Sequence, residues 1–197
     1  MTRWVFEPGH TAAEFCARHM MVTHVRGHIK DVHGALEFDP SDPTRGSVQA
    51  TLDARKLWSG EEARDAHLKS EDFLDVANHP EITFRGEEVA ALGSHAMRVD
   101  GKLTIRGTTR PASLRARYLG SWETSWWEGG VDHGPVRRIG FVAETTIDRH
   151  DFGVSWNSAL DRGGVVVGSE VRIRIDVEAV PAGFMDGLEP GRVDRAP

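Results

Sequence analysis

The sequence predicts an all-β domain, a closed antiparallel barrel of about eight strands with one short helical insertion. Apolar and polar residues alternate along most of the chain, which places them on opposite faces of strands. The clearest stripe is Val171, Ile173, Ile175, Val177 and Ala179, with charged residues between them. Turn-forming residues separate the stripes, and no helix-length apolar period lies between most neighbours. Consecutive strands are therefore expected to be antiparallel and joined by hairpins.

The predicted strands cover residues 12–20, 32–38, 47–54, 81–89, 97–106, 113–118, 139–147 and 171–179. Strands with one apolar face must bury that face, and closing the sheet into a barrel also removes its unpaired edges. A two-sheet sandwich would show the same alternation, so periodicity alone leaves both architectures open.

The segment 59–78 breaks the alternation. Ser59-Gly60-Glu61-Glu62 matches a capping box at a helix start, and a helix-forming run follows as far as Leu68. Asn78 and Pro80 indicate the stop. We expect a short helical insertion between the third and fourth strands that covers one end of the barrel. Residues 1–180 then form one domain, and 181–197, rich in proline, glycine and charge, are expected to be a flexible C-terminal tail.

Composition narrows the function classes. Charged residues make up 27% of the chain and its net charge is −6, which argues against a nucleic-acid partner because phosphate binding needs a basic surface. The one cysteine cannot form an internal disulfide. The N-terminus lacks an apolar core of signal-peptide length, and no stretch approaches the ~20 apolar residues that span a bilayer. A cytoplasmic location is the expectation.

Several inward positions carry small side chains. An eight-stranded barrel is just wide enough to be filled by side chains or to hold one small ligand. Small inward residues leave room for a ligand, although they also suit the taper of a packed core. These residues are Ala13, Ala17, Ala50, Ala54, Ala116 and Ala143.

Five ordered blocks resemble the YceI-like family. The match runs from about Trp4 to Val180, nearly the whole predicted domain. The blocks are His10–His19, Val25–Gly27 with Gly34–Leu36, Arg64–Asp75 with His79–Phe84, Leu103–Pro111, and Ile147–Val154 with Val167–Val171. Two departures stand out: Thr11 lies where the family often has serine, and the tryptophan-rich segment 121–130 matches no family block, so ligand identity could be tuned there.

The resemblance implies a lipocalin-like barrel whose elongated apolar channel binds a polyisoprenoid, an isoprenoid quinone or a similar lipid. It also implies a bacterial protein, in some members a homodimer, with no common catalytic activity and no cofactor. Exposed tryptophans near the barrel mouth would allow at most transient membrane contact. The predicted ligand contacts are Phe15, Ala17, His19, Leu36, Phe38, Leu52, Trp58, Arg64, His67, Leu68, Phe73, Phe84, Leu103, Phe141, Phe152 and Trp156.

The polar candidates have competing interpretations. His19 ends an inward stripe, so it is either a head-group contact or a core histidine with a structural hydrogen bond. Arg64 and His67 share a helix face, where they either anchor the insertion or contact a head group at the mouth. One alternative function is an enzyme on a lipophilic substrate that uses His19 or His67 as its acid or base.

A metal-binding barrel is the other alternative. Histidines crowd the first two strands, but their spacing is not a compact zinc pattern and alternation scatters them over both faces. We therefore predict no metal site. These histidines are His10, His19, His24, His28 and His33.

Overall fold

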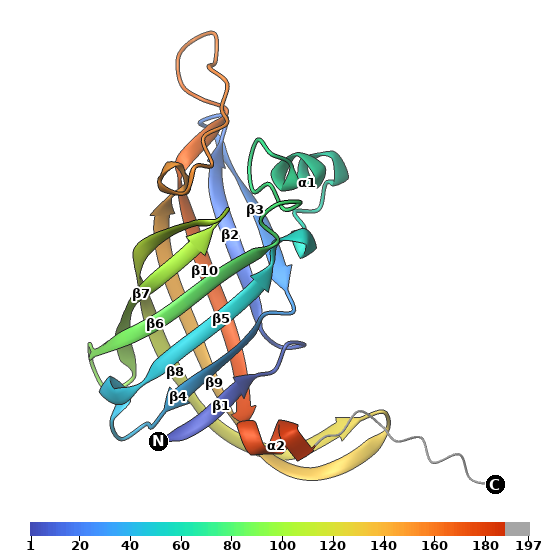
Figure 1. Cartoon of the computed structure of the whole chain (residues 1–197), viewed down its shortest axis with the longest axis vertical. Coiled ribbons are helices and arrows are strands. Elements are labelled where there is room, and N and C mark those ends of the chain that lie inside the picture. Colours follow the sequence, from blue (N-terminus) through green and yellow to red (C-terminus); the bar gives the residue numbers. More distant parts are fainter. Residues whose placement is uncertain (188–197) are drawn as a thin grey trace, which may run out of the picture.

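The structure, a computed structural model, describes residues 1–187 of the chain. Figure 1 shows a tall β-barrel with helix α1 beside its upper end and helix α2 at its lower end. The strands are β1 (Thr2–Phe6), β2 (Ala12–His19), β3 (Thr23–Lys30), β4 (His33–Phe38), β5 (Ser47–Asp53), β6 (Glu81–Ala91), β7 (Ala96–Ile105), β8 (Thr108–Glu128), β9 (Val131–Asp148) and β10 (Val167–Pro181). The helices are α1 (Glu62–Lys69) and α2 (Ala182–Gly187), with short 3₁₀ turns η1 (Pro43–Arg45), η2 (Ala54–Lys56) and η3 (Arg149–Phe152). Neither α-helix of the described residues is long and apolar enough to cross a membrane.

The strands form one closed antiparallel sheet. Their order is β1-β4-β5-β6-β7-β8-β9-β10-β2-β3, and β1 also pairs with β10. Because β1 and β2 pair with successive parts of β10, they act as one broken strand. Strands β4 and β3 continue alongside them in the same way and form a second broken strand. Counting each broken strand once confirms the predicted closed eight-stranded barrel.

At the break between β1 and β2, the hydroxyl of Thr11 forms hydrogen bonds with the backbone of β10. Thr11 is 1% exposed. Its Oγ1 donates a hydrogen bond to the carbonyl of Glu178 (3.2 Å) and accepts one from the Glu178 N–H (3.3 Å). The hydroxyl therefore satisfies the Glu178 N–H and shares the Glu178 carbonyl with the N–H of Glu7 (2.9 Å), at a point where the bend in the neighbouring strand interrupts the ladder.

Replacing Thr11 with valine is expected to lower the free energy of unfolding by about 1–3 kcal/mol, because the Glu178 N–H loses its partner while the side-chain shape is kept. For a chain of this size that corresponds to roughly 2–4 °C in Tm per kcal/mol. Thermal unfolding of Thr11→Val and Thr11→Ser tests this. Serine keeps the hydroxyl and should stay close to the natural protein; a loss of stability in Thr11→Ser with none in Thr11→Val would assign the effect to the methyl group instead.

The helical insertion lies between β5 and β6, the third and fourth positions in the barrel, as predicted. Its cap differs from the expected capping box. The side chain of Glu61 accepts hydrogen bonds from the N–H groups of Ala63 and Arg64, so Glu61 is the N-cap. Ser59 instead donates its backbone N–H to the Asp65 carboxylate (2.9 Å), and this bond holds the start of the insertion against α1.

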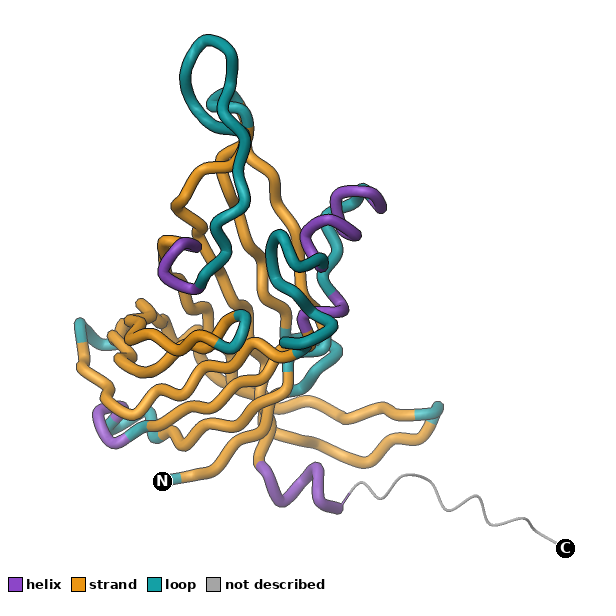
Figure 2. The backbone as a smooth tube through the Cα atoms, turned by 45° about the horizontal axis from the view of Figure 1, so that its top comes forward, coloured by secondary structure: helices purple, strands orange, loops and turns teal. Residues whose placement is uncertain are grey.

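Two segments differ from the prediction. Strands β8 and β9 extend past the barrel, and residues 119–138 form a hairpin arm that contains the tryptophan-rich segment (Figures 1 and 2). Residues 182–187, predicted as the start of a flexible tail, form helix α2, because Phe184 packs against Trp126 of the arm with ring centroids 5.3 Å apart. Pro181, the first residue of the predicted tail, ends β10, and residues 188–197 lie outside the described residues.

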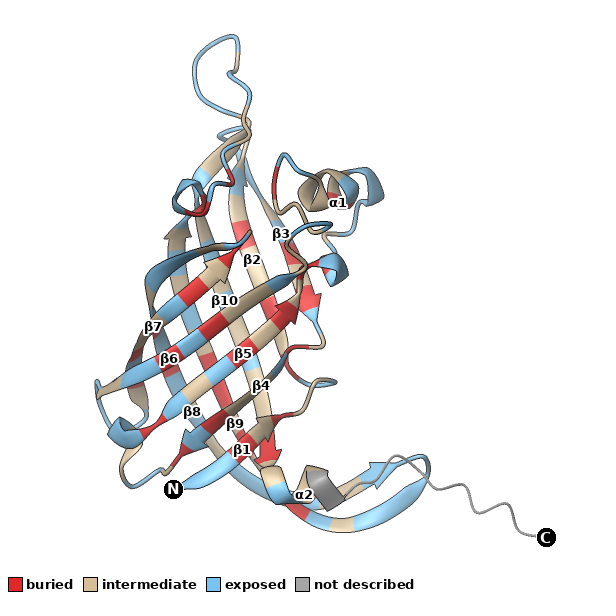
Figure 3. Ribbon diagram, in the orientation of Figure 1, coloured by how far each residue is buried: buried red, intermediate tan, exposed pale blue. Residues whose placement is uncertain are grey.

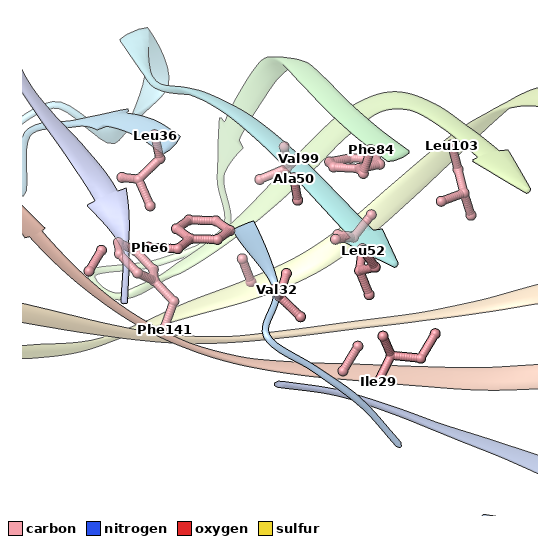
Figure 4. Close-up of a cluster of buried hydrophobic side chains, with 14 of the residues drawn as sticks. Phe6, Ile29, Val32, Leu36, Ala50, Leu52, Phe84, Val99, Leu103 and Phe141 are labelled. Atoms are coloured by element: carbon pink, nitrogen blue, oxygen red, sulfur yellow. The ribbon is translucent and has the colours of Figure 1, made fainter. Parts of the chain in front are cut away.

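The buried residues follow the inner face of the barrel (Figure 3). Figure 4 shows how side chains from several strands, among them Phe6, Ile29, Leu52 and Phe141, converge on the interior. Packing is tightest between β3 and β4 and near the end of β10, where Val32, Ala179 and Val180 are all 0% exposed.

Candidate ligand cavity

The barrel encloses an elongated cavity of about 270 Å³. Every strand contributes at least one inward side chain to its wall, which includes Phe6, Ala13, Ile29, Leu36, Ala50, Phe84, Met97, Leu114, Phe141 and Ile175. The lining extends from the β4–β5 turn near the lower end to α1 and η3 at the upper end. This length suits a chain-like ligand more than a compact one.

The interior is hollow and not filled by a solid core. On β10 the inward side chains of Val171, Ile173, Ile175 and Val177 are only half-buried, although their strand is paired on both sides. Such exposure on an inward face reflects open space within the barrel. Small side chains create much of this space, since the wall includes Ala13, Ala17, Ala50, Ala116 and Ala143. Ala54 lies apart from it, in η2.

The wall is almost entirely apolar. Its charged residues are Glu14, Glu37 and Arg149, and its hydroxyl residues are Ser47 and Thr145. Glu37 and Ser47 are exposed at the β4–β5 turn. Because a wall of this composition offers few hydrogen-bond partners, the middle of the cavity suits hydrocarbon and disfavours polar groups.

Two segments close the upper end, where the sheet pairing is incomplete. The ladder between β8 and β9 ends at Arg115 and Glu144, although β9 continues to Asp148. The η3 segment (149–154) covers this opening with Phe152 and Val154.

On the opposite side, the ladder between β4 and β5 ends at His33 and Thr51. Above it, β3 is joined to the chain after β5 through the isolated bridge between His28 and Trp58. The α1 segment (57–80) supplies the cover there, with Leu68, Phe73 and Leu74 in the wall of the cavity.

Arg106 joins the two covering segments. It occupies the β7–β8 turn, and its guanidinium donates to the carbonyl of Gly153 (2.6 Å) and to the carbonyl of Glu71 (2.8 Å). The backbone of Arg106 has a φ of +50° and that of Gly107 a φ of +70°. Both values belong to a type I′ turn, which favours Asn-Gly, so arginine occupies a position that its backbone does not prefer.

Most of the predicted ligand contacts lie in the cavity wall. These are Phe15, Ala17, Leu36, Phe38, Leu52, Leu68, Phe73, Phe84, Leu103, Phe141 and Phe152. Phe15 is representative: its ring lies across Gly27 on the paired strand, where a Cβ would come within 2.4 Å of the ring. That these side chains contact a ligand stays a prediction.

The wall does not include His19, Trp58, Arg64, His67 or Trp156, and that these residues contact a ligand at the mouth or elsewhere stays a prediction. His19 ends β2 beyond Ala17, where a register shift interrupts its pairing with β10. Trp58 is 60% exposed, because its backbone bridge to His28 holds it outside the barrel.

Two of these residues, His67 and Arg64, make contacts that hold the α1 segment together. His67 packs edge-on against both Phe73 and Trp156, with ring centroids 4.9 and 4.7 Å apart, and its Nε2 lies 2.9 Å from Asp72. Arg64 donates to the hydroxyl and the carbonyl of Ser59, each at 2.8 Å. The anchoring interpretation of Arg64 therefore describes its position.

Sequence reasoning missed Arg149, which is 4% exposed and lies in the cavity wall. Burial disfavours the charged form and lowers the pKa of Arg149 below its usual value. Alternation could not have located it, because it lies in the 3₁₀ turn after β9, where the period of two ends. The tryptophan-rich segment 121–130, where ligand identity was expected to be tuned, contributes no residue to the wall.

One side-chain cluster among the described residues has the composition of a metal site. Glu7 Oε2 lies 2.6 Å from His10 Nδ1, and Glu178 Oε1 lies 3.7 Å from it. Arg138 places its guanidinium 3.2 Å from the same Glu178 oxygen. The cluster therefore already contains a cation, and it lies where Glu178 spans the break between β1 and β2.

A closed eight-stranded antiparallel barrel around an apolar cavity belongs to the lipocalin-like class of barrels. A model of the YceI-like domain matches residues 4–179, so this chain belongs to the YceI-like family. A UPF0312 protein of Pseudomonas aeruginosa (strain LESB58) is 31% identical over 174 residues, which are 88% of this chain and 83% of the relative. One from Vibrio cholerae serotype O1 (strain M66-2) is 30% identical over 145 residues, 74% of this chain and 72% of the relative.

Solved structures share the fold. Burkholderia cenocepacia BcnA aligns with a TM-score of 0.70 at 22% identity, covering 88% of this chain and 98% of BcnA. A polyisoprenoid binding domain from Saccharophagus degradans, implicated in plant cell wall breakdown, aligns with a TM-score of 0.61 at 13% identity, covering 92% and 99%.

Proposed function

We propose that this protein binds one long apolar amphiphile in the barrel and stores or transports it. The ligand class is a polyisoprenoid, an isoprenoid quinone or a lipid of similar shape. The observation that carries the proposal is the elongated, almost wholly apolar cavity of about 270 Å³, with wall residues from every strand. The family membership and a structural neighbour described as a polyisoprenoid binding domain support the same ligand class.

Apolar area supplies enough energy for such binding. Burying ~300 Å² of hydrocarbon at roughly 25 cal/mol per Å² contributes about 7 kcal/mol before the cost of ordering the ligand. This contribution of buried apolar area to the binding free energy does not depend on the identity of a head group. Tail length and cavity length therefore decide how tightly a ligand is held, and polar groups decide which head is accepted.

The positions of the histidines favour binding over acid–base catalysis. Neither His19 nor His67 lies in the cavity wall. His67 is held between the rings of Phe73 and Trp156 and next to Asp72. A general base must reach the proton that it removes, and neither side chain is part of the wall that would surround the ligand.

Native mass spectrometry of the untagged protein, followed by organic extraction, tests the proposal. We expect a co-purifying isoprenoid-like lipid at close to one per chain, or uptake of one when the empty protein is incubated with isoprenoid lipids. A clean apo mass together with no uptake would overturn the proposal, because it would mean that the barrel does not open to such ligands.

A further inference from the structure

We propose that Arg149 forms the head-group subsite of the cavity and selects amphiphiles with an anionic oxygen head, such as a carboxylate or a phosphate. This inference rests on the proposed lipid-binding function and adds the chemistry and the orientation of the ligand. It assigns the head to the upper end, beneath η3, and the tail to the apolar length of the barrel.

The guanidinium of Arg149 is fixed by the backbone around it. Nε donates to the carbonyl of Gly168 (2.9 Å), Nη1 to the carbonyls of Val154 (2.6 Å) and Trp156 (3.0 Å), and Nη2 to that of Val167 (3.2 Å). A guanidinium has five N–H donors. These bonds use four of them, so Nη2 retains one N–H for a further acceptor.

Among residues 1–187 the guanidinium of Arg149 forms no ion pair, although the more distant carboxylate of the adjacent Asp148 favours its charged form. None of the described salt bridges includes it, and all of its hydrogen-bond acceptors are neutral carbonyls. The carboxylate of the adjacent Asp148 accepts the backbone N–H of His150 (2.9 Å) on the outside of the turn. An arginine stays protonated even when burial lowers its pKa. A buried charge is costly unless it is paired, and an anionic ligand oxygen would pair it.

The other charges of the wall favour one orientation. Arg149 is the only cationic side chain among the described residues of the cavity wall, where the other charged residues are Glu14 and Glu37. Glu14 lies 3.8 Å from Arg26 in an ion pair, and Glu37 is exposed near the lower end. An anionic head at the β4–β5 turn would meet Glu37, whereas at the upper end it would meet Arg149.

Three probes with one tail test the selection: farnesoic acid, farnesol and farnesylamine, titrated against the natural protein at pH 7.5. We expect the acid to bind at least tenfold more tightly than the amine, with the alcohol between them. The net charge of −6 repels the acid and attracts the amine, so the electrostatic field of the whole protein cannot produce this order of affinities. Equal affinities, or a tighter amine, would overturn the Arg149 subsite and leave the proposed function intact. If none of the probes binds, the proposed function itself fails.

Orientation gives a second test that needs no variant at Arg149. Hexadecanoic acid with a nitroxide close to its carboxylate should broaden the amide NMR signals of Phe152, Gly153 and Val154. The same acid labelled at its far end should broaden those of Glu37 and Ser47. The reverse pattern would overturn the proposal. Arg149→Met should erase the preference for the acid wherever the variant keeps the far-ultraviolet circular dichroism of the barrel, and a folded variant that retains the preference would also overturn it.

Discussion

Replacing Ala143 with phenylalanine is expected to weaken ligand uptake at least tenfold while the barrel stays folded. Ala143 lies in the cavity wall opposite Ala116 on β8 and next to Ile175 on β10, at mid-height. A ring at this position occupies the space through which the chain of a ligand must pass. A ligand that loses ~60 Å² of apolar contact loses about 1.5 kcal/mol, close to a tenfold change in Kd.

The matched control is Thr146→Phe, which adds the same ring to the outer, exposed face of the same strand. Titration with a fluorescent isoprenoid lipid, alongside thermal unfolding, measures both effects. We expect unchanged uptake for the control and no large loss of Tm for Ala143→Phe, because the new ring fills existing space. Uptake that survives in a folded Ala143→Phe variant would mean that the ligand binds elsewhere on the protein.

Replacing Arg106 with asparagine is expected to accelerate ligand release by about 5–30-fold, the factor that corresponds to 1–2 kcal/mol. The variant removes the hydrogen bonds to Gly153 and Glu71, which join the two segments that cover the upper end. Hydrogen bonds to a charged group contribute about 1.5–3 kcal/mol each. Because both bonds are exposed, water can bind the freed carbonyls and recover part of this energy. Asparagine suits the type I′ turn better than arginine, so the β7–β8 hairpin should keep its stability.

Amide hydrogen exchange of the empty protein measures the same opening without a ligand. The reporters are the N–H groups of Leu74, Asp75 and Val76, which are bonded to carbonyls of the α1 segment. The control is Arg110→Asn on β8, since Arg110 bonds only the adjacent Thr109 carbonyl (3.3 Å). Exchange at the three reporters that is no faster in Arg106→Asn than in the control would show that Arg106 does not hold the cover closed.

Particular residues show what could be predicted for the site. The inward stripes located Phe15, Leu52, Leu103 and Phe141, because alternation alone decides which face of a strand a residue occupies. The helix pattern left two roles open for Arg64 and His67, since one helix face can turn toward a cavity or toward its own loop. The contacts to Ser59 and Asp72 decide that choice, and they form only once the segment folds back on itself.

The extent of the strands depended on packing as well. Residues 119–138 were not predicted as a hairpin arm because their alternation is broken by register shifts, after Tyr118 and again after Ser125. Helix α2 was missed for a related reason: Phe184 packs against Trp126, which only the fold brings next to it.

The sequence by itself determined the class of this protein: a closed barrel with an apolar interior, a helical insertion in the right place and membership of the YceI-like family. These follow from local periodicity and ordered blocks, which each segment carries on its own. Only the tertiary structure decided that the interior is hollow, that Arg106 joins both covering segments, and that Arg149 is a buried cation at the upper end. Each of these depends on distances between residues far apart in the chain, and a period of two contains no information about such distances.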